Sequence, residues 1–386
     1  MRIVIAAGIF PPDIGGPATY AAALADYLSA RGHTVAVICY GTERQDAVDT
    51  PYTVHRVPRG MVLITYGKYL VALWKLALRA DCIYAQGPVA GGIQSFLVSR
   101  LLARPYAVKV TGDYAWEQAV VRYKSTVSID AFQRTSQGIP LSIRVIRLLQ
   151  RWVVRHADQV VVPSTYLRTM VLGWCAPEKN VAVIFNAVSS VPMAHANEGS
   201  RRGINEPLVL SVGRLVPWKG FSELIKLWPR VLSRLQAKLI IVGDGPQRSQ
   251  LETIIEKMHL QSSCLLVGRK AADELANYYP AADLFVLNSG YEGFAHTILE
   301  AQAHGVVVAA SLAGGNPEIV EHGVSGLLFS YNAADEIVDC ITDLLQHRDK
   351  AGRLAAAALR NLKRFDPKLV FGQTMELLQR CAAKRG

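Results

Sequence analysis

The sequence predicts an α/β protein in which two parallel β-sheets, each covered by helices, form two separate domains. Length supports two domains, because 386 residues exceed what one hydrophobic core usually serves. Short runs rich in Val and Ile alternate with helical patterns, which is typical of βαβ units. This alternation occurs twice, on either side of a polar segment at residues 189–207. Each half of the chain is therefore expected to fold around its own parallel sheet.

Strands are expected at the short apolar runs, with helices in the gaps between them. In the first half these runs are residues 2–7, 33–40, 52–57, 82–87, 106–112 and 159–164. In the second half they are residues 207–213, 237–245, 264–268, 283–289, 305–311 and 326–330.

The segment at residues 189–207 contains Gly, Pro, Ser and Asn and lacks periodicity, which predicts an interdomain linker. The expected domains are residues 1–190 and 191–367. Near the C-terminus, Pro367 interrupts a helical stretch, because proline ends or kinks a helix. A separate final helix is therefore expected at residues 368–386.

Composition limits the class of protein. Hydrophobic residues make up 51% of the chain and charged residues 19%, which excludes a disordered protein. The six cysteines are scattered singly, without zinc-ligand spacing, as expected in a reducing cytosol. The first residues read as a strand and not as a signal peptide, and no stretch reaches the ~20 uninterrupted apolar residues of a spanning helix. We expect a cytoplasmic protein, either soluble or bound at a membrane surface.

The net charge of +11 is concentrated in the first half. Residues 1–190 contain 20 Lys and Arg against 11 Asp and Glu, whereas the remaining residues contain 22 against 20. Such an excess attracts phosphates, anionic lipid headgroups or nucleic acid, although most basic surfaces are only solvated. Nucleic acid is the least favoured partner, because the sequence has no recognisable platform of aromatic residues.

The first candidate site is the glycine pair Gly15-Gly16, which follows a strand and opens an amphipathic helix. Glycine allows close backbone approach, and a helix N-terminus offers free N–H groups to a phosphate or sugar oxygen. The alternative is a tight turn that simply needs glycine. The segment lacks the full G-x-G-x-x-G pattern, so a nicotinamide cofactor is disfavoured.

The second candidate site is the segment VGRLVPWKGF at residues 212–221, in which Arg214 and Lys219 follow a strand. The carboxyl ends of parallel strands open onto the ligand crevice of α/β folds. A guanidinium and an ammonium there suit a diphosphate. The alternative is ordinary surface charge.

The third candidate site is the segment at residues 288–305, in which Glu292 precedes a helix expected to start near residues 294–295 and Glu300 lies within it. Eight residues at helical rise span about 12 Å, roughly the distance from a hexose to the ribose of a nucleotide-sugar. The amides of Gly293, Phe294 and Ala295 would face a diphosphate at the helix N-terminus. The alternative is a helix with an acidic first turn and a solvent-facing Glu300.

These motifs occur in one order along the chain. They are the glycine loop at 15–16, GRLVPWKG at 213–220, VGDGP at 242–246, EGFAHTILE at 292–300 and GGNPEIVEHGVSGLLF at 314–329. In this order the sequence resembles the retaining glycosyltransferase family four, also called the group 1 or glycogen-synthase-like glycosyltransferases. The resemblance covers nearly the whole chain. It implies the GT-B fold, in which two facing Rossmann-like domains enclose a central cleft and the C-terminal helix crosses back onto the first domain.

The resemblance also implies roles for individual residues. Arg214 and Lys219 would contact the diphosphate of a nucleotide-sugar donor, Glu300 would hold its ribose, and Glu292 would meet the transferred sugar. The backbone at Val267, with Arg269 or Lys270, would flank the base. Family members work without a metal, and this sequence has no Asp-x-Asp motif for one. No cofactor is expected, since the nucleotide-sugar is itself the substrate.

Two departures from the family pattern concern the reacting sugar. Ala295 replaces a common glycine and adds a methyl group near the donor sugar. After residues 106–112, where many members place a histidine, the sequence continues with Asp113. Asp113, with Glu117 close behind, is the nearest candidate to replace that histidine as a catalytic group. The alternative is that Asp113 only caps the following helix.

A stripe of arginines suggests a second kind of partner. Spacings of 3, 4 and 4 place Arg144, Arg147, Arg151 and Arg155 on one face of a helix, opposite Ile143, Ile146, Leu149, Trp152 and Val153. The first interpretation is a solvated helix packed on its apolar side. The alternative is docking of the arginines on anionic lipid, helped by interfacial anchors in residues 60–79.

The function expected from these observations is transfer of a hexose-type sugar from a nucleotide-sugar to a glycan or lipid-linked acceptor, with retention, in cell-envelope polysaccharide or glycoconjugate synthesis. Two alternatives remain open. One is a sugar-nucleotide-binding subunit without turnover, and the other is a sugar-nucleotide epimerase of similar architecture.

Overall fold

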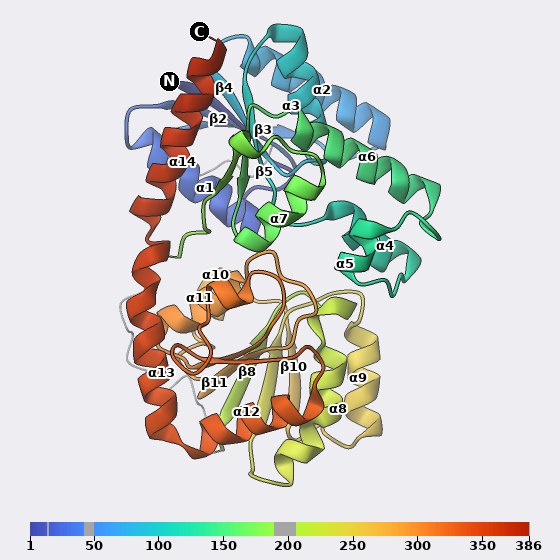
Figure 1. Cartoon of the computed structure of the whole chain (residues 1–386), viewed down its shortest axis with the longest axis vertical. Helices are drawn as coiled ribbons and strands as arrows, with labels where there is room; N and C mark the ends of the chain where they lie inside the picture. Colours follow the sequence, from blue (N-terminus) through green and yellow to red (C-terminus); the bar gives the residue numbers. More distant parts are fainter. Residues whose placement is uncertain (14, 42–49, 189–205, 386) are drawn as a thin grey trace. The chain divides into compact units, whose positions relative to one another are not determined.

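The computed structural model describes residues 1–13, 15–41, 50–188 and 206–385 (Figure 1). The chain divides into two compact units, Met1–Ala187 with Pro367–Gly386 as unit 1 and Val188–Asp366 as unit 2. The final helix α14 (Pro367–Ala382) belongs to unit 1, although unit 2 precedes it in the chain. Most of the expected linker at residues 189–207 lies outside the described residues.

Unit 1 is built on one parallel sheet with the strand order β3-β2-β1-β4-β5-β6-β7. Its strands are β1 (Arg2–Ala6), β2 (Thr34–Tyr40), β3 (Thr53–Val57), β4 (Cys82–Gln86), β5 (Tyr106–Lys109), β6 (Gln159–Val162) and β7 (Val181–Val183). The six strands expected in this half are confirmed. The short strand β7, three half-buried residues at the sheet edge, was not expected.

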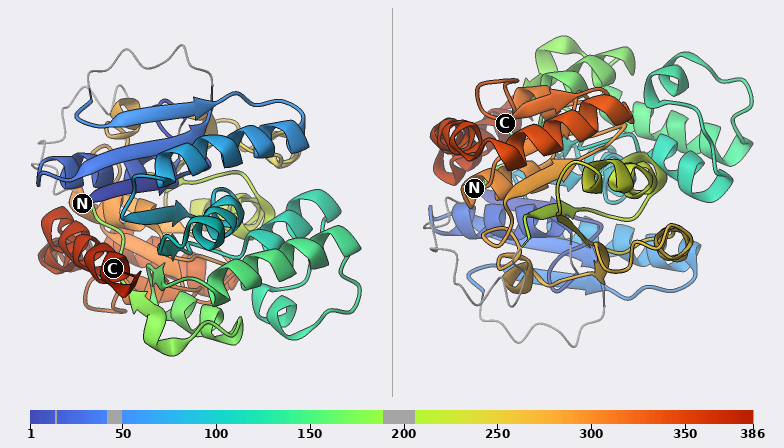
Figure 2. Two further views of the ribbon diagram at one scale, coloured as in Figure 1. Left: turned by 90° about the horizontal axis from the view of Figure 1, so that it is seen from above. Right: turned by 90° about the horizontal axis from the view of Figure 1, so that it is seen from below.

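Helices cover both faces of this sheet (Figures 1 and 2). On one face, α1 (Gly16–Ser29) and α14 pack on each other and share a core in which Leu24, Phe371 and Leu377 are buried. On the other face lie α2 (Val62–Ala77) and α3 (Gly92–Leu102), with α6 (Leu141–Arg155) packed beside α3. The remaining helices are α4 (Tyr114–Tyr123), α5 (Ile129–Arg134) and α7 (Thr165–Gly173). Among the described residues, no helix is both long and apolar enough to cross a membrane.

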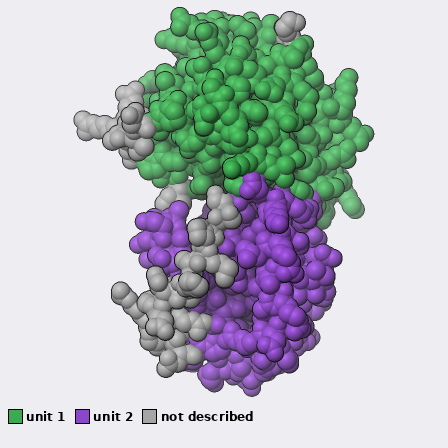
Figure 3. All heavy atoms as spheres, turned by 90° about the vertical axis from the view of Figure 1, so that its left-hand side faces the viewer, with its two compact units in different colours: residues 1–187, 367–386 green, residues 188–366 purple. Residues whose placement is uncertain are grey.

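Unit 2 repeats this plan with the strand order β10-β9-β8-β11-β12-β13, again all parallel (Figure 3 colours the two units separately). The strands are β8 (Leu208–Val212), β9 (Lys238–Val242), β10 (Cys264–Gly268), β11 (Leu284–Leu287), β12 (Val308–Ser311) and β13 (Leu327–Phe329), as expected from the sequence. The helices are α8 (Phe221–Leu232), α9 (Arg248–Lys257), α10 (Ala272–Leu275), α11 (His296–Ala303), α12 (Ala334–Gln346) and α13 (Arg348–Asn361). A short 3₁₀ turn at Leu362–Phe365 then separates α13 from α14, which confirms the interruption expected before Pro367.

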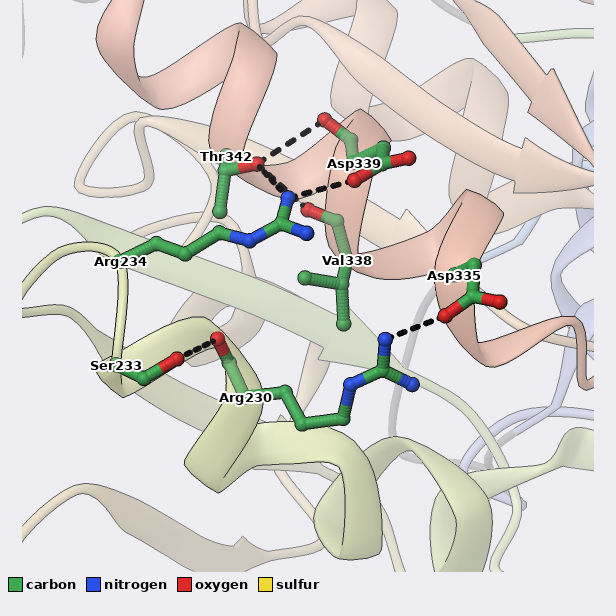
Figure 4. Close-up of polar contacts among 7 residues, drawn as sticks. All are labelled: Arg230, Ser233, Arg234, Asp335, Val338, Asp339 and Thr342. Atoms are coloured by element: carbon green, nitrogen blue, oxygen red, sulfur yellow. Dashed lines mark hydrogen bonds and ion pairs between the residues drawn. The ribbon is translucent and has the colours of Figure 1, made fainter.

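Helices α8 and α12 show which forces hold unit 2 together. At the surface, Arg230 of α8 pairs with Asp335 of α12, and Arg234, just beyond the end of α8, pairs with Asp339 of α12 (Figure 4). Exposed ion pairs are screened by water and stabilise weakly. Beneath them, Trp228 and Ile341 are fully buried, and each buried side chain of this size contributes about 1.5–3 kcal/mol. Apolar burial therefore dominates this contact.

One buried cation in unit 1 works against stability. Lys109 ends β5 and is only 2% exposed, with its Nζ 3.2 Å from the centre of the Tyr20 ring. Among the described residues this ammonium has no hydrogen-bond partner. Burial therefore holds the pKa of Lys109 well below its usual value.

Replacing Lys109 should stabilise the protein. We expect Lys109→Met to raise the free energy of unfolding by about 1–3 kcal/mol near neutral pH, because the unpaired amine no longer has to be desolvated. The unfolded chain binds more protons at Lys109 than the folded one, so wild-type stability rises with pH from the lowered folded pKa up to the ordinary value of 10.5. The gain from Lys109→Met should shrink over the same range in thermal unfolding measurements. Exposed Lys68→Met serves as the control, and a loss of stability in Lys109→Met would contradict this account.

Candidate functional site

The candidate site lies at the carboxyl edge of the unit 2 sheet. All its strands are parallel, so the loops that follow β8, β9, β11 and β12 emerge at the same edge. The loop after β8 carries Arg214 and Lys219, and the loop after β11 carries Glu292. The sheet topology thus brings together two motifs that are distant in the sequence.

Glycines let these loops touch backbone to backbone. Gly314, in the loop after β12, has a φ of +56°, and a Cβ there would lie 1.8 Å from the carbonyl oxygen of Glu292. Gly220, after the β8 loop, has a φ of +64°, and its Cβ would lie 2.1 Å from the carbonyl oxygen of Asn288. Gly315 also donates its N–H to Glu292 O at 2.9 Å. The β11 loop is therefore held from both sides by positions that only glycine can occupy.

An ion pair joins the two central loops. Lys219 Nζ lies 2.5 Å from Glu292 Oε1, and the side chains are 15% and 10% exposed. Gly290 N–H adds a backbone hydrogen bond to Trp218 O at 2.7 Å. A charge pair this far out of water interacts strongly, and losing one partner costs about 3–5 kcal/mol at buried sites. Lys219 and Glu292 thus form one charged unit.

Arg214 lies on the same loop as Lys219 and is exposed. Its guanidinium sits over the Trp218 ring, 5.5 Å from the ring centre. Leu215 N–H donates to Asp244 O at 3.0 Å, which ties this loop to the loop after β9. The loop after β8 therefore presents one exposed and one paired cation at the sheet edge.

Glu300 lies in α11 and is held by a residue that no sequence motif pointed to. The Tyr279 hydroxyl donates to Glu300 Oε2 at 2.5 Å, and the Tyr279 ring stacks on His304 with ring centres 5.1 Å apart. Burial raises the pKa of Glu300, and the hydrogen bond from Tyr279 opposes that rise. Glu300 is thus a largely buried carboxylate with a fixed orientation, and the solvent-facing alternative is not what the structure has.

The backbone amides of residues 293–295 come directly before helix α11. The helix begins at His296, with Ala295 at its N-cap and no side chain capping it. Gly293, Phe294 and Ala295 therefore precede the first turn, and the Phe294 ring packs edge-on against Phe365 at 5.7 Å between ring centres. A helix N-terminus suits an anion.

At the end of β10, the strand pairing is irregular. Leu266 pairs with Ile241 and Gly268 with Val242, so the ladder skips Val267. Arg269 is exposed and Lys270 is half-buried just beyond the strand. Val267, Arg269 and Lys270 thus lie at the same carboxyl edge as Arg214.

Gly15 and Gly16 belong to unit 1. Gly15 is the N-cap of α1, which starts at Gly16 and also lacks a side-chain cap. A Cβ at Gly15 would approach Ile9 Cδ1 to 3.0 Å, so the turn is tight. Both readings of this glycine pair, a tight turn and an open helix N-terminus, are compatible with this geometry.

Asp113 has the geometry of a helix cap. Its side chain is fully buried and accepts hydrogen bonds from Trp116 N at 3.0 Å, Gln133 Nε2 at 2.6 Å and Gln150 Nε2 at 2.7 Å. Glu117 follows in the first turn of α4. These three hydrogen bonds engage the Asp113 carboxylate within unit 1. They favour the helix-capping alternative over a catalytic role.

With two parallel sheets and this loop arrangement, the fold is that of the GT-B glycosyltransferases. Two family models match the chain, "Glycosyl transferases group 1" over residues 196–360 and "Glycosyl transferase 4-like domain" over residues 15–187. The chain belongs to the group 1 glycosyltransferases and is a transferase enzyme, as the sequence motifs predicted.

Individual relatives agree with this family. A GDP-mannose-dependent alpha-mannosyltransferase of Mycobacterium tuberculosis is 27% identical over 376 residues, covering 94% of this chain and 92% of the relative. An uncharacterised glycosyltransferase of Methanocaldococcus jannaschii is 27% identical over 339 residues, covering 85% and 84%. Anabaena HepE, solved in complex with UDP-glucose, superposes with a TM-score of 0.79 at 21% identity, covering 98% of this chain and 100% of that chain. This last likeness shows the fold.

Removing the Asp113 carboxylate should destabilise unit 1 without touching donor binding. We expect Asp113→Ala to lower the free energy of unfolding by about 1–3 kcal/mol, because buried amide donors lose their acceptor. Ser128→Ala, which removes the cap of α5, should cost only about 1 kcal/mol and is the matched control. Thermal unfolding measures both variants. If Asp113→Asn, which keeps the shape, unfolds like the wild type but has lost its transfer activity, Asp113 is catalytic after all.

Proposed function

We propose that this protein is a retaining glycosyltransferase that moves a hexose-type sugar from a nucleoside-diphosphate sugar to a glycan or lipid-linked acceptor. The Lys219–Glu292 ion pair at the carboxyl edge of the unit 2 sheet carries this proposal. An ammonium group can bind phosphate, and a carboxylate can accept hydrogen bonds from sugar hydroxyls. Two comparisons support the donor class. The mycobacterial relative is named as GDP-mannose-dependent, and HepE was solved with UDP-glucose.

In the proposed complex, the donor diphosphate exchanges partners with the ion pair. Its two negative charges draw the Lys219 ammonium away from Glu292, and the exposed Arg214 guanidinium binds a phosphate with two parallel hydrogen bonds. Glu292 is then free to accept hydrogen bonds from hydroxyls of the transferred sugar. The amides of Gly293, Phe294 and Ala295 complete the diphosphate site.

The other end of the donor meets Glu300. Tyr279 holds one carboxylate oxygen of Glu300, which leaves the second oxygen to accept hydrogen bonds from the ribose hydroxyls. The base lies against the irregular end of β10, between the backbone at Val267 and the side chains of Arg269 and Lys270. The methyl group of Ala295 adjusts the choice of sugar, because it narrows the space beside the reacting ring.

Transfer is proposed to occur on one face of the sugar. The acceptor oxygen bonds to the anomeric carbon as the bond from that carbon to the diphosphate oxygen breaks, and the acceptor proton passes to the leaving phosphate. Configuration is retained without a protein nucleophile. Arg214 and Lys219 stabilise the charge that develops on the leaving diphosphate, the role that a metal ion plays in metal-dependent transferases.

The proposed setting is synthesis of cell-envelope polysaccharide or glycoconjugate at a cytoplasmic membrane face. The basic excess in residues 1–190 supports this setting, because lipid-linked acceptors lie at anionic surfaces.

Substituting the two glutamates should separate binding from chemistry. We expect Glu300→Gln to raise KM for the donor roughly tenfold to a hundredfold, since a charged hydrogen bond to ribose is worth about 1.5–3 kcal/mol. Glu292→Gln should mainly lower kcat, because its carboxylate orients the reacting sugar. Steady-state transfer to a matching acceptor measures both effects.

Glu256→Gln, on the exposed face of α9, is the control and should match the wild type. If Glu292→Gln and Glu300→Gln also match the wild type, the site assignment is wrong. The same assay separates the alternatives: donor conversion without any acceptor indicates an epimerase, and donor binding without any turnover indicates a binding subunit.

A further inference from the structure

Helix α6 exposes part of its apolar residues, although Ile143 and Val153 of the same helix are buried. Leu148 is 68% exposed and Trp152 is 53% exposed, whereas Arg147, from the expected cationic face, is only 6% exposed. The Arg147 guanidinium donates to the carbonyls of Thr135 at 2.6 Å and Gln133 at 2.8 Å. Arg147 is therefore not part of the expected solvated stripe, whereas Arg144 and Arg155 are exposed as expected. Leu149 and Trp152, expected on the packed side, are exposed instead.

Neighbouring helices continue this outward apolar surface. Helix α3 packs between α2 and α6, and the three form one layer over the same sheet face (Figures 1 and 2). Phe96 of α3 contacts Trp152 edge-on, with ring centres 6.3 Å apart. We define the outer face of this layer by six exposed side chains. They are Leu63, Trp74, Leu101, Leu141, Leu148 and Trp152.

The charges on this layer have a single sign. Helices α2, α3 and α6 contain no Asp or Glu. Exposed cations accompany the apolar side chains throughout, namely Lys68, Lys75, Arg100, Arg144 and Arg155. A second copy of the chain would bring like charges together on this face, whereas an anionic surface would neutralise them.

We propose that the outer face of α2, α3 and α6 docks on an anionic lipid bilayer. The leucines enter the boundary between headgroups and acyl chains, and Trp74 and Trp152 take the interfacial position that suits an amphipathic ring. The lysines and arginines reach the lipid phosphates while their aliphatic stems cover apolar surface. This inference rests on the proposed membrane setting but not on the transfer chemistry.

Vesicle sedimentation of the full-length protein tests this docking. Wild type should bind vesicles of phosphatidylcholine mixed with phosphatidylglycerol, bind phosphatidylcholine alone weakly, and lose binding as salt rises. Leu148→Ser with Trp152→Ser should weaken partitioning by about tenfold or more, because two apolar groups no longer leave water. Lys68→Gln with Lys75→Gln should also weaken it, by about thirtyfold, which corresponds to roughly 1 kcal/mol per cation.

Matched controls carry the same changes elsewhere. Val324→Ser with Leu369→Ser removes exposed apolar side chains away from the layer, and Lys257→Gln with Lys363→Gln removes exposed cations from unit 2. Both controls should bind like the wild type, and circular dichroism confirms that every variant is folded. Equal binding to both kinds of vesicle, or equal loss in variants and controls, would overturn the docking surface.

Two further outcomes are decisive. A dimer in sedimentation velocity that Leu148→Ser with Trp152→Ser abolishes would show that a second copy covers this face, against the proposal. Transfer to a soluble acceptor is measured in parallel. Vesicle binding without transfer would contradict the proposed function alone, and transfer without vesicle binding would contradict the docking surface alone.

Discussion

The ion pair between Lys219 and Glu292 is the contact around which the unit 2 site is organised. It joins the loop after β8 to the loop after β11, and the close backbone contacts of Gly220 and Gly314 hold those loops in place. Parallel strands make this meeting possible, because they deliver every loop to one edge. An ammonium group and a carboxylate that pair with each other can also separate, and each can then bind a ligand group. A site for a charged sugar donor needs this property.

Several other buried charged groups of the protein also have hydrogen-bond partners. Tyr279 fixes Glu300 through one oxygen, so that a largely buried carboxylate keeps a hydrogen-bond partner. Arg214, by contrast, is exposed over Trp218 and pairs with no carboxylate among the described residues. In unit 1, Asp113 is enclosed by amide donors and Arg147 by carbonyl acceptors. From the sequence alone, Asp113 is a candidate for catalysis and Arg147 for lipid binding. In the structure both side chains instead hold helices of unit 1 through these hydrogen bonds.

Much of the fold could be predicted, because parallel strands buried on both faces are continuous apolar runs that stand out from helical patterns. The short edge strand β7 was not predicted, although residues 181–185 are all apolar. The residues of the site were predictable where they adjoin strand ends, as Arg214, Lys219 and Glu292 do. Tyr279 was not, because its role arises from contacts with Glu300 and His304 that no local pattern encodes. The outward-facing side of α6 depends on the hydrogen bonds that Arg147 donates to backbone carbonyls. The periodicity of the sequence does not predict these contacts.

Thermal unfolding with a panel of nucleoside diphosphates and nucleotide-sugars tests the central claim most directly, that the Lys219–Glu292 pair opens to receive a donor diphosphate. A ligand at a hundred times its Kd stabilises the folded state by about 2.7 kcal/mol. We predict that at least one nucleotide-sugar stabilises the wild type in this way. Lys219→Gln should lose most of the effect, and Lys226→Gln, which changes an exposed lysine paired with Glu223, should keep it. Stabilisation by none of the panel, or equal stabilisation of both variants, would contradict the account.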